Sequence, residues 1–295
     1  MADLEALRRQ EYSTNLRMLL QQRMSKFREY AQFTDANGSK AVRLESQIDK
    51  VTVTRRTGSA ELLDNSAATF TGRWVNQPLP FHFDKILDER IDLASMNISP
   101  GAPLLQAAVS SLNRQIDDDF LSAFFGTAKT GETGGTNTSF TAGNQVATTV
   151  GATTGMNTEK LDAVLELMMT NEVDLDTETP VIAIGPKQHT NLKALSQVTS
   201  GDFSKKFVLD GDGRVKHFNG FNIIVSYRLP TDGDGYRRCP VWVKSGMGAG
   251  LWFDIKPDLR RLPNYKGNPY VVEAESCMAF SRLEENRCYE IKCAE

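Results

Sequence analysis

The first hydrophobic pattern along the chain runs from Leu4 to Phe33, where apolar residues recur at helical spacing with arginines between them. This pattern is typical of an amphipathic helix or arm, and Asn37-Gly38 provides a turn signal at its end. The segment has too few apolar residues to close a core of its own. Its apolar stripe therefore needs a partner, which is either the rest of the subunit or a neighbouring chain. The apolar positions are Tyr12, Leu16, Leu19 or Leu20, Met24, Phe27 and Ala31.

The next pattern is an alternation of period two, which predicts a long two-stranded excursion. Residues 41–57 are rich in Val, Ile and Thr and partly alternate, as a half-exposed strand would. A polar tip follows at 58–69, and the chain returns through an aromatic stretch, 70–83, that contains Pro78 and Pro80. The prolines favour an edge strand or a bend. A hairpin of this length is marginal alone in water, so we expect it to lie on another surface.

A longer helical stripe occupies the middle of the chain. Ser99 and Pro100 fit a helix N-cap and first turn, and Gly126 ends the pattern. A helix of this length would extend about 38 Å and could cross a domain. Residues 127–154 are nearly all Gly, Thr, Ser, Ala and Asn, which predicts an extended loop, with or without short strands. The apolar stripe of the helix comprises Leu105, Val109, Leu112, Ile116, Phe120 and Phe124.

The second half of the chain alternates between helical and strand patterns, which makes the predicted fold class α+β. Helices are expected around Leu161–Met168 and over Lys187–Val198. Strands are expected at Val181–Ile184, Gly220–Tyr227, Val241–Lys244, Leu251–Ile255, Tyr270–Phe280 and Arg287–Cys293.

Composition narrows the class of protein. The chain has 295 residues and a net charge of -3, which argues against tight electrostatic binding of nucleic acid but leaves a container for DNA open. No apolar run approaches the roughly 20 residues that cross a bilayer, and the N-terminus lacks a secretory apolar core, so we expect a cytoplasmic location without a membrane. The cysteines form no CxxC pair and are expected to be buried free thiols. They are Cys239, Cys277, Cys288 and Cys293.

Motifs that could carry chemistry fail at specific positions. Residues 126–133, GTAKTGET, approach the phosphate-binding GxxxxGK[ST] pattern, but Glu132 stands where a lysine must neutralise phosphate. Gly246, Gly248 and Gly250 are expected in a hairpin turn or bulge, since a strand pattern follows them where a dinucleotide fingerprint needs a helix.

Metal and acid-base chemistry lack support as well. The DGDG runs at 210–213 and 232–235 do not continue into a calcium loop, so solvated turns are favoured. The carboxylate runs at 117–119 and 284–285 are expected to face water. A Cys-His pair is not excluded by sequence distance alone, but the cysteines lie in core-like strands. We therefore predict no catalytic residue, no cofactor and no metal site. The three histidines, which are not at metal-ligand spacing, are His82, His189 and His217.

The order of these segments resembles that of tailed-bacteriophage major capsid proteins with the Hong Kong 97-like fold. Local strings resemble one group of phage capsid proteins, and they span most of residues 123–295. These strings are AFFGTAKTGETG (123–134), MTNEVDLD (169–176), PKQHTNLKALSQV (186–198), NGFNIIVSYRLP (219–230), YRRCPVWVKSGM (236–247) and the closing EIKCAE.

The resemblance implies a structural role without enzymatic activity. It implies an N-terminal arm at 1–38, an E-loop at 41–90, a peripheral domain at 91–157 and 250–295, and an axial domain at 158–249. Such proteins form hexamers and pentamers that close an icosahedral shell around double-stranded DNA. The implied partners are a scaffolding protein, a portal, cement proteins in some phages, and DNA bound without sequence specificity. The implied location is the virion capsid, assembled in the cytoplasm of the host bacterium.

The surfaces expected to contact neighbouring subunits are the arm and the E-loop. We hypothesise that Arg55 and Arg56 pair with carboxylates of an adjacent subunit; the alternative is that they are solvated charges worth about 0 to 1 kcal/mol. No lysine occurs between Lys50 and Lys85, so an E-loop isopeptide crosslink is not expected. The interface residues expected are Leu16, Leu20, Phe27, Arg55, Arg56, Glu61, Leu62, Asp64, Phe70 and Trp74.

Two other functions stay open from the sequence. An encapsulin-type compartment would use a similar subunit to enclose an enzyme cargo, and the shell contents would distinguish it from a capsid. A nucleotide-using enzyme rests only on the incomplete motifs, and micromolar nucleotide binding would support it.

Overall fold

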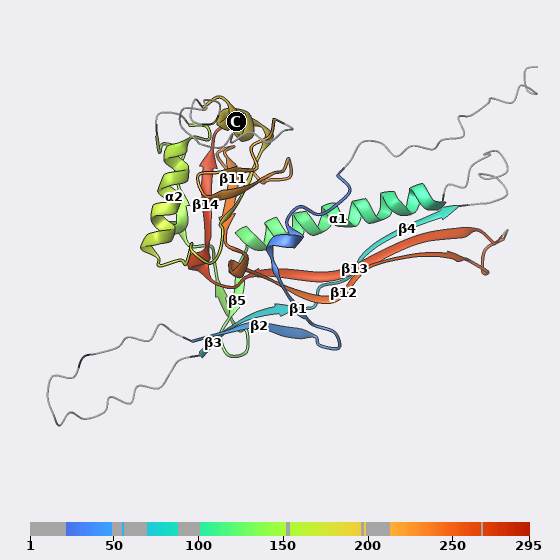
Figure 1. Cartoon of the computed structure of the whole chain (residues 1–295). Helices are drawn as coiled ribbons and strands as arrows, with labels where there is room; N and C mark the ends of the chain where they lie inside the picture. Colours follow the sequence, from blue (N-terminus) through green and yellow to red (C-terminus); the bar gives the residue numbers. More distant parts are fainter. Residues whose placement is uncertain are drawn as a thin grey trace, which may run out of the picture. The chain divides into compact units, whose positions relative to one another are not determined.

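The computed structural model describes residues 22–48, 55, 70–87, 101–151, 154–195, 198, 213–266 and 268–295. The chain divides into two compact units. Figure 1 labels most of the helices and strands named below. The described residues of the first unit fall within Met1–Ser25, Leu79–Ile116 and Phe253–Cys277. Those of the second unit fall within Lys26–Pro78, Asp117–Trp252 and Met278–Glu295.

Three long elements contribute to both units. They are helix α1 (Gly101–Phe125), strand β12 (Met247–Arg261) and strand β13 (Tyr270–Arg282). The helical stripe predicted from the sequence is confirmed, because α1 covers the expected span. Four residues of that stripe are buried, namely Leu112, Ile116, Phe120 and Phe124. The proposed cap residues Ser99 and Pro100 lie outside the described residues.

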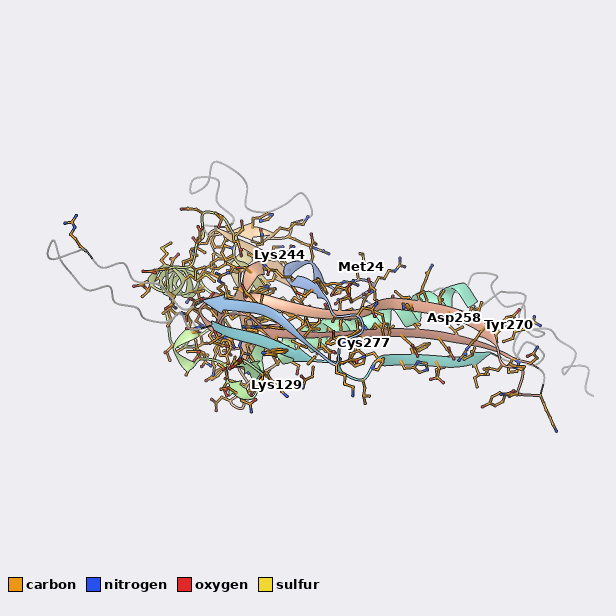
Figure 2. All side chains as sticks on the ribbon, turned by 90° about the horizontal axis from the view of Figure 1, so that it is seen from below. Met24, Lys129, Lys244, Asp258, Tyr270 and Cys277 are labelled. Carbon is orange, nitrogen blue, oxygen red and sulfur yellow. The ribbon has the colours of Figure 1, made fainter. Side chains whose placement is uncertain are left out.

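In the first unit, strand β4 (Phe81–Leu87) pairs antiparallel with β13 from Tyr270↔Leu87 to Ser276↔Phe81. A small core forms where Ala108 and Leu112 of α1 meet Ala274 of β13. Phe81 and Phe83 of β4 pack on this cluster because alternate residues of a strand face the same side. The ribbon of β12 and β13 carries side chains on both faces, with Asp258, Tyr270 and Cys277 along it (Figure 2).

The spacing of the N-terminal segment predicted an amphipathic helix or an arm, and its described part, from Gln22 onward, forms an arm. In the first unit, the carbonyls of Gln22 and Arg23 accept hydrogen bonds from Arg114 and Asn113 of α1, at 3.2 and 3.0 Å. In the second unit, Arg28–Tyr30 forms a short 3-10 turn, η2, and Gln32–Asp35 forms strand β1. In this described part, long-range partners for the backbone therefore replace the hydrogen bonds of a helix.

The main sheet of the second unit has the strand order β7-β14-β11-β8-β10-β9. Strands β8 and β10 are parallel, and β11 runs antiparallel to both β8 and β14. Besides the second part of α1, the described residues of this unit form helices α2 (Thr158–Thr170) and α3 (Pro186–Lys193). The side chain of the α2 N-cap, Asn157, accepts from the Lys160 amide at 2.9 Å. The strands are β7 (Gln145–Val146), β8 (Val181–Ile184), β9 (His217–Phe218), β10 (Phe221–Val225), β11 (Arg237–Trp242) and β14 (Cys288–Cys293).

A second sheet of this unit contains the predicted hairpin and has the order β2-β3-β5-β6. Strand β2 (Ala41–Ile48) pairs with β3 (Phe70–Asn76), and a register shift lies between Arg43 and Glu45. Because β4 pairs with β13 instead, the two-stranded hairpin ends at Asn76. The Gly/Thr-rich loop supplies the two short strands β5 (Ala128–Thr130) and β6 (Thr136–Thr138), and the 3-10 turn η4 (Ala142–Asn144) follows them.

Several sequence predictions differ from the structure in detail. The predicted helix over Lys187–Val198 ends as α3 at Lys193. The predicted strand at Val241–Lys244 overlaps β11 only at Val241 and Trp242, because β11 spans Arg237–Trp242 and Lys244 begins a 3-10 turn. Gly248 and Gly250 do not form a hairpin turn, because they lie inside β12 and pair with the parallel strand β1. A Cβ atom at Gly248 would lie 2.6 Å from a methyl group of Leu283, so close packing explains this glycine.

Candidate functional site

The base of the hairpin is fixed by contacts with the Gly/Thr-rich loop. The indole N–H of Trp74 on β3 donates to the carbonyl of Gly131 at 2.9 Å. At Gly134, where φ is +74°, a Cβ atom would lie 3.0 Å from the Trp74 side chain. The turn between β5 and β6 therefore needs glycine both for its backbone conformation and for its close approach to Trp74.

A buried ionic network ties the same strand to the C-terminal part of the chain. Arg73 of β3 is 7 % exposed and pairs with Glu285 at 3.3 Å. Glu285 lies in the 3-10 turn η6 (Glu285–Arg287) and also accepts from Arg282 at 2.9 Å. Desolvation lowers the pKa of Arg73, and the charge of Glu285 opposes this effect. Glu285 thus bridges two guanidinium groups, and this bridge holds β3 against the end of β13.

Arg282 also caps the end of helix α1. Its side chain is fully buried, and its Nη1 atom donates to the carbonyls of Ala123, Phe124 and Gly126 at 3.3, 2.5 and 2.6 Å. Its Nη2 atom donates to the carbonyl of Thr138 at 3.2 Å. The last carbonyls of a helix lack intrahelical partners and carry partial negative charge, so a guanidinium group suits this position.

The arm is anchored in the second unit by a carboxylate of α1. Asp117 is fully buried and accepts the backbone N–H groups of Lys26 and Phe27, at 3.0 and 3.3 Å. The Phe27 ring stacks on Phe120 with ring centroids 5.3 Å apart, and Trp242 lies against both rings. The indole N–H of Trp242 donates to the carbonyl of Tyr30 at 3.0 Å.

These contacts correct two sequence predictions. Phe27, which we expected at a subunit interface, is fully buried in the core of its own chain. The carboxylates at 117–119 and 284–285 do not simply face water, because Asp117 binds the arm, Asp118 pairs with Arg228, and Glu285 bridges two arginines. Their partners are distant in the sequence and could not be read from local charge patterns.

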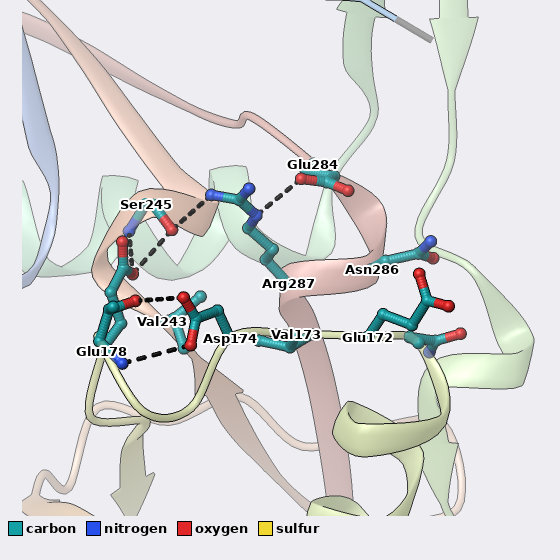
Figure 3. Close-up of a pocket in the computed structure, with 11 residues that line it drawn as sticks. Glu172, Val173, Asp174, Glu178, Val243, Ser245, Glu284, Asn286 and Arg287 are labelled. Atoms are coloured by element: carbon teal, nitrogen blue, oxygen red, sulfur yellow. Dashed lines mark hydrogen bonds and ion pairs between the residues drawn. The ribbon is translucent and has the colours of Figure 1, made fainter. Parts of the chain in front are cut away.

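A polar pocket of about 230 Å³ lies between the loop after α2 and the turn η6 (Figure 3). The backbone N–H and hydroxyl of Ser245 donate to Glu178, at 3.1 and 2.7 Å, and Arg287 donates to the Ser245 hydroxyl at 2.6 Å. Arg287 also pairs with Glu284 at 2.6 Å. The hydrogen bond from the Thr177 hydroxyl lowers the pKa of Asp174. These polar groups bind one another, and the lining includes no histidine that could activate Ser245.

The incomplete motifs have structural explanations. Glu132 is exposed in the β5–β6 turn. The 126–133 motif begins directly after helix α1 and runs through β5 into this turn, whereas a phosphate loop leads from a strand into a helix. In the second DGDG run, Asp232 accepts the N–H groups of Asp234 and Tyr236, at 3.1 and 2.9 Å, and pairs with Lys292 at 3.1 Å. This run is a turn stabilised by its own aspartate. Of the first run, 210–213, only Gly213 is among the described residues, with φ +68°.

Two of the three histidines bind partners within the described part of the chain. His82 pairs with Glu275 at 2.8 Å, and His189 accepts the Val215 N–H at 3.2 Å. The four cysteines are free and buried, as predicted. The described residues contain no group of three or more His, Cys, Asp or Glu side chains that could hold a metal ion. None of the described helices is long and apolar enough to span a bilayer.

The remaining predicted interface residues are only partly described. Arg55 is exposed, and Trp74 is half-buried against the Gly/Thr-rich loop. Phe70 begins β3. The others, Leu16, Leu20, Arg56, Glu61, Leu62 and Asp64, lie outside the described residues.

Comparison with known proteins identifies the family. The family model described as phage capsid protein matches residues 4–295 of the chain. The chain belongs to this phage capsid protein family. No curated protein matches the chain.

Solved structures show the fold of this capsid chain. It is similar to the capsid of the cyanophage P-SCSP1u, with a TM-score of 0.73 and 15 % identity over 100 % of this chain and 95 % of the other. It is also similar to the capsid of the cyanophage Pam1, with a TM-score of 0.73 and 12 % identity over 100 % and 99 % of the two chains. The fold is therefore the Hong Kong 97-like capsid fold, in its α+β form.

An encapsulin has the same fold. The holo-SrpI encapsulin of Synechococcus elongatus matches with a TM-score of 0.61 and 12 % identity, over 99 % of this chain and 95 % of the other. Its TM-score is lower than those of the two cyanophage capsids.

Proposed function

We propose that this capsid protein self-assembles as hexamers and pentamers into an icosahedral shell that encloses the double-stranded DNA of a tailed phage. The observation that carries this proposal is the family match over nearly the whole chain. The buried network of Arg73, Glu285 and Arg282 supports it, because it gives the hairpin a fixed base from which to reach a neighbour. The role is structural, and we propose no catalytic activity.

The hairpin and the arm are the proposed contacts with neighbouring subunits. Arg55 is exposed, and no carboxylate among the described residues pairs with it. We assign Arg55 and Arg56 to ion pairs with carboxylates of an adjacent subunit. Leu16, Leu20, Glu61, Leu62, Asp64 and Phe70 belong to the same proposed surfaces, together with the part of Trp74 that the loop leaves open.

The domain limits and the other partners are part of this proposal. The arm spans 1–38, the E-loop 41–90, the peripheral domain 91–157 and 250–295, and the axial domain 158–249. A scaffolding protein, a portal and, in some relatives, cement proteins would act with the chain in the host cytoplasm. The shell would be held without covalent crosslinks, since no lysine lies between Lys50 and Lys85.

The test combines assembly with a charge reversal. The chain expressed with its neighbouring phage genes should give closed shells by negative-stain electron microscopy. The variant Arg55→Glu/Arg56→Glu should remain folded by circular dichroism but give no shells. Normal shells from this variant would refute the ion pairs, whereas a wild-type chain that forms no particles would refute the shell function itself.

The encapsulin likeness supports a second candidate, a compartment that encloses protein cargo. Nuclease treatment and gel analysis of opened particles separate the two functions. Packaged DNA supports the capsid, and a stoichiometric second protein without DNA supports the compartment.

A further inference from the structure

The outer face of helix α2 in the second unit is open to solvent and acidic. Leu161, Val164 and Met168 are buried, so this side of the helix packs inside the unit. On the outer side, Met169 is 63 % exposed and borders a shallow groove. The groove is lined by Asp162, Leu165, Glu166, Met169 and Thr170.

Glu166 is the carboxylate of this face that has no ion-pair partner among the described residues. Asp162 accepts a hydrogen bond from the Asn219 side chain at 2.7 Å. For Glu166, in contrast, no cation of the described residues lies within ion-pairing distance. The α2 face therefore combines an exposed thioether, a half-buried leucine and a free negative charge. A partner with a cation and some apolar surface would fit it.

The same unit carries a basic surface where α3 meets the edge strand β9. The Ile223 amide donates to the Lys216 carbonyl at 2.7 Å, and the Val215 amide donates to the His189 ring at 3.2 Å. These bonds place the segment before β9 against α3. Lys193 lies one turn after His189 on α3, and Arg214 directly precedes Val215, whose amide donates to the His189 ring. The charges of both residues add to the desolvation that lowers the pKa of His189. We call Lys193 and Arg214 the basic edge.

The basic edge also lacks partners in the part of the chain that the structure describes. Lys193 and Arg214 are both exposed, and neither forms an ion pair with a described carboxylate. Within the described residues, one unit thus presents an acidic face and a basic edge, on different elements, that have no ion-pair partners. Two such distinct, complementary patches on identical subunits define a head-to-tail contact, which closes into a ring when the rotation between copies divides a full turn.

We propose that the outer face of α2 in one copy binds the basic edge of α3 and β9 in a second copy, with Glu166 opposite Arg214. The inference rests on the proposed assembly and gives hexamers and pentamers a specific ring contact. A second copy fits better than DNA, because the α2 carboxylates would repel phosphate while Met169 offers apolar contact to protein.

A charge swap tests the contact. Glu166→Lys and Arg214→Glu should each reduce the yield of closed particles at least tenfold, since like charges then meet across the ring. The double variant Glu166→Lys/Arg214→Glu, with its net charge unchanged, should restore particles. The matched controls Asp176→Lys and Lys244→Glu change exposed charges of the same unit by the same amounts and should assemble normally.

The results separate a failure of the proposed contact from a failure of the proposed shell function. Thermal melting of each variant before assembly establishes that it is folded. Normal particles from either single variant, or no rescue by the folded double variant, would overturn the proposed contact while the shell function stands. A wild-type chain that forms no particles beside these variants would instead refute the proposed function.

Discussion

Replacing Arg282 by methionine tests whether one buried guanidinium holds three parts of the second unit together. Methionine keeps an unbranched apolar stem but removes every donor. The change removes the hydrogen-bond donor of the Phe124 and Gly126 carbonyls. Of the two arginines that pair with Glu285, only Arg73 remains. The hairpin base, the end of α1 and the end of β13 should all lose order.

The expected loss of stability follows from the burial of the Arg282–Glu285 ion pair. Arg282 is fully buried, and the side chain of Glu285 is 14 % exposed, so solvent screens the interaction little. Removing one partner of a buried ion pair costs about 3–5 kcal/mol, because the other charge stays desolvated. Arg73 can still neutralise Glu285, which places the expected loss near the lower end, about 3 kcal/mol. Arg282→Lys keeps the charge but not the fork of donors and should lose about 1–2 kcal/mol.

Urea denaturation of the unassembled subunit, followed by tryptophan fluorescence, measures these losses because Trp242 is fully buried. Arg260→Met is the matched control: Arg260 is 58 % exposed in its pair with Glu273, so its removal should cost no more than about 1 kcal/mol. The reasoning fails if Arg282→Met is as stable as the wild type or loses no more than Arg260→Met.

Three further outcomes are expected. Burial lowers the pKa of His189 below its usual 6.5, and the charges of Lys193 and Arg214 add to this effect, so the unfolded state binds more protons than the folded state. The free energy of unfolding should therefore fall as the pH drops below about 6.5. The variant His189→Gln should flatten this pH dependence in urea titrations. Burial raises the pKa of Cys288, and all four cysteines are buried, so a thiol reagent should label no cysteine in the native subunit and all four in urea. Rapid labelling of the native subunit would contradict the burial of the cysteines. Gly134→Ala should destabilise the subunit by about 1–3 kcal/mol, since φ is +74° and the new Cβ meets Trp74, whereas an unchanged melting temperature would show that the turn relaxes freely.

The elements set by local periodicity could be predicted from the sequence. Helix α1 has an apolar stripe over its whole length, and β8 is a continuous buried run, so their positions were predicted well. The hairpin was predicted from alternation and from the prolines, but its end was not. Strand β4 has the same alternation as β3, and only its pairing with β13 assigns it to another sheet.

The contacts that fix the site depend on residues far apart in the sequence. Asp117 looks like part of a solvated acidic run, yet its partners Lys26 and Phe27 lie 91 and 90 positions away. Gly248 looks like a turn residue until Leu283 and the parallel strand β1 are in place. Phe27 followed the helical spacing of the arm, but an aromatic cluster with Phe120 and Trp242 buries it in an extended segment. Local patterns carry no information about such partners.

A cryo-electron microscopy reconstruction of the particles formed when the chain is expressed with its neighbouring phage genes would show whether this chain builds a shell. We expect closed icosahedral shells built from hexamers and pentamers of this chain, with β2–β3 hairpins reaching adjacent subunits. Expression that gives folded chains without shells, or shells built from another protein, would contradict this expectation.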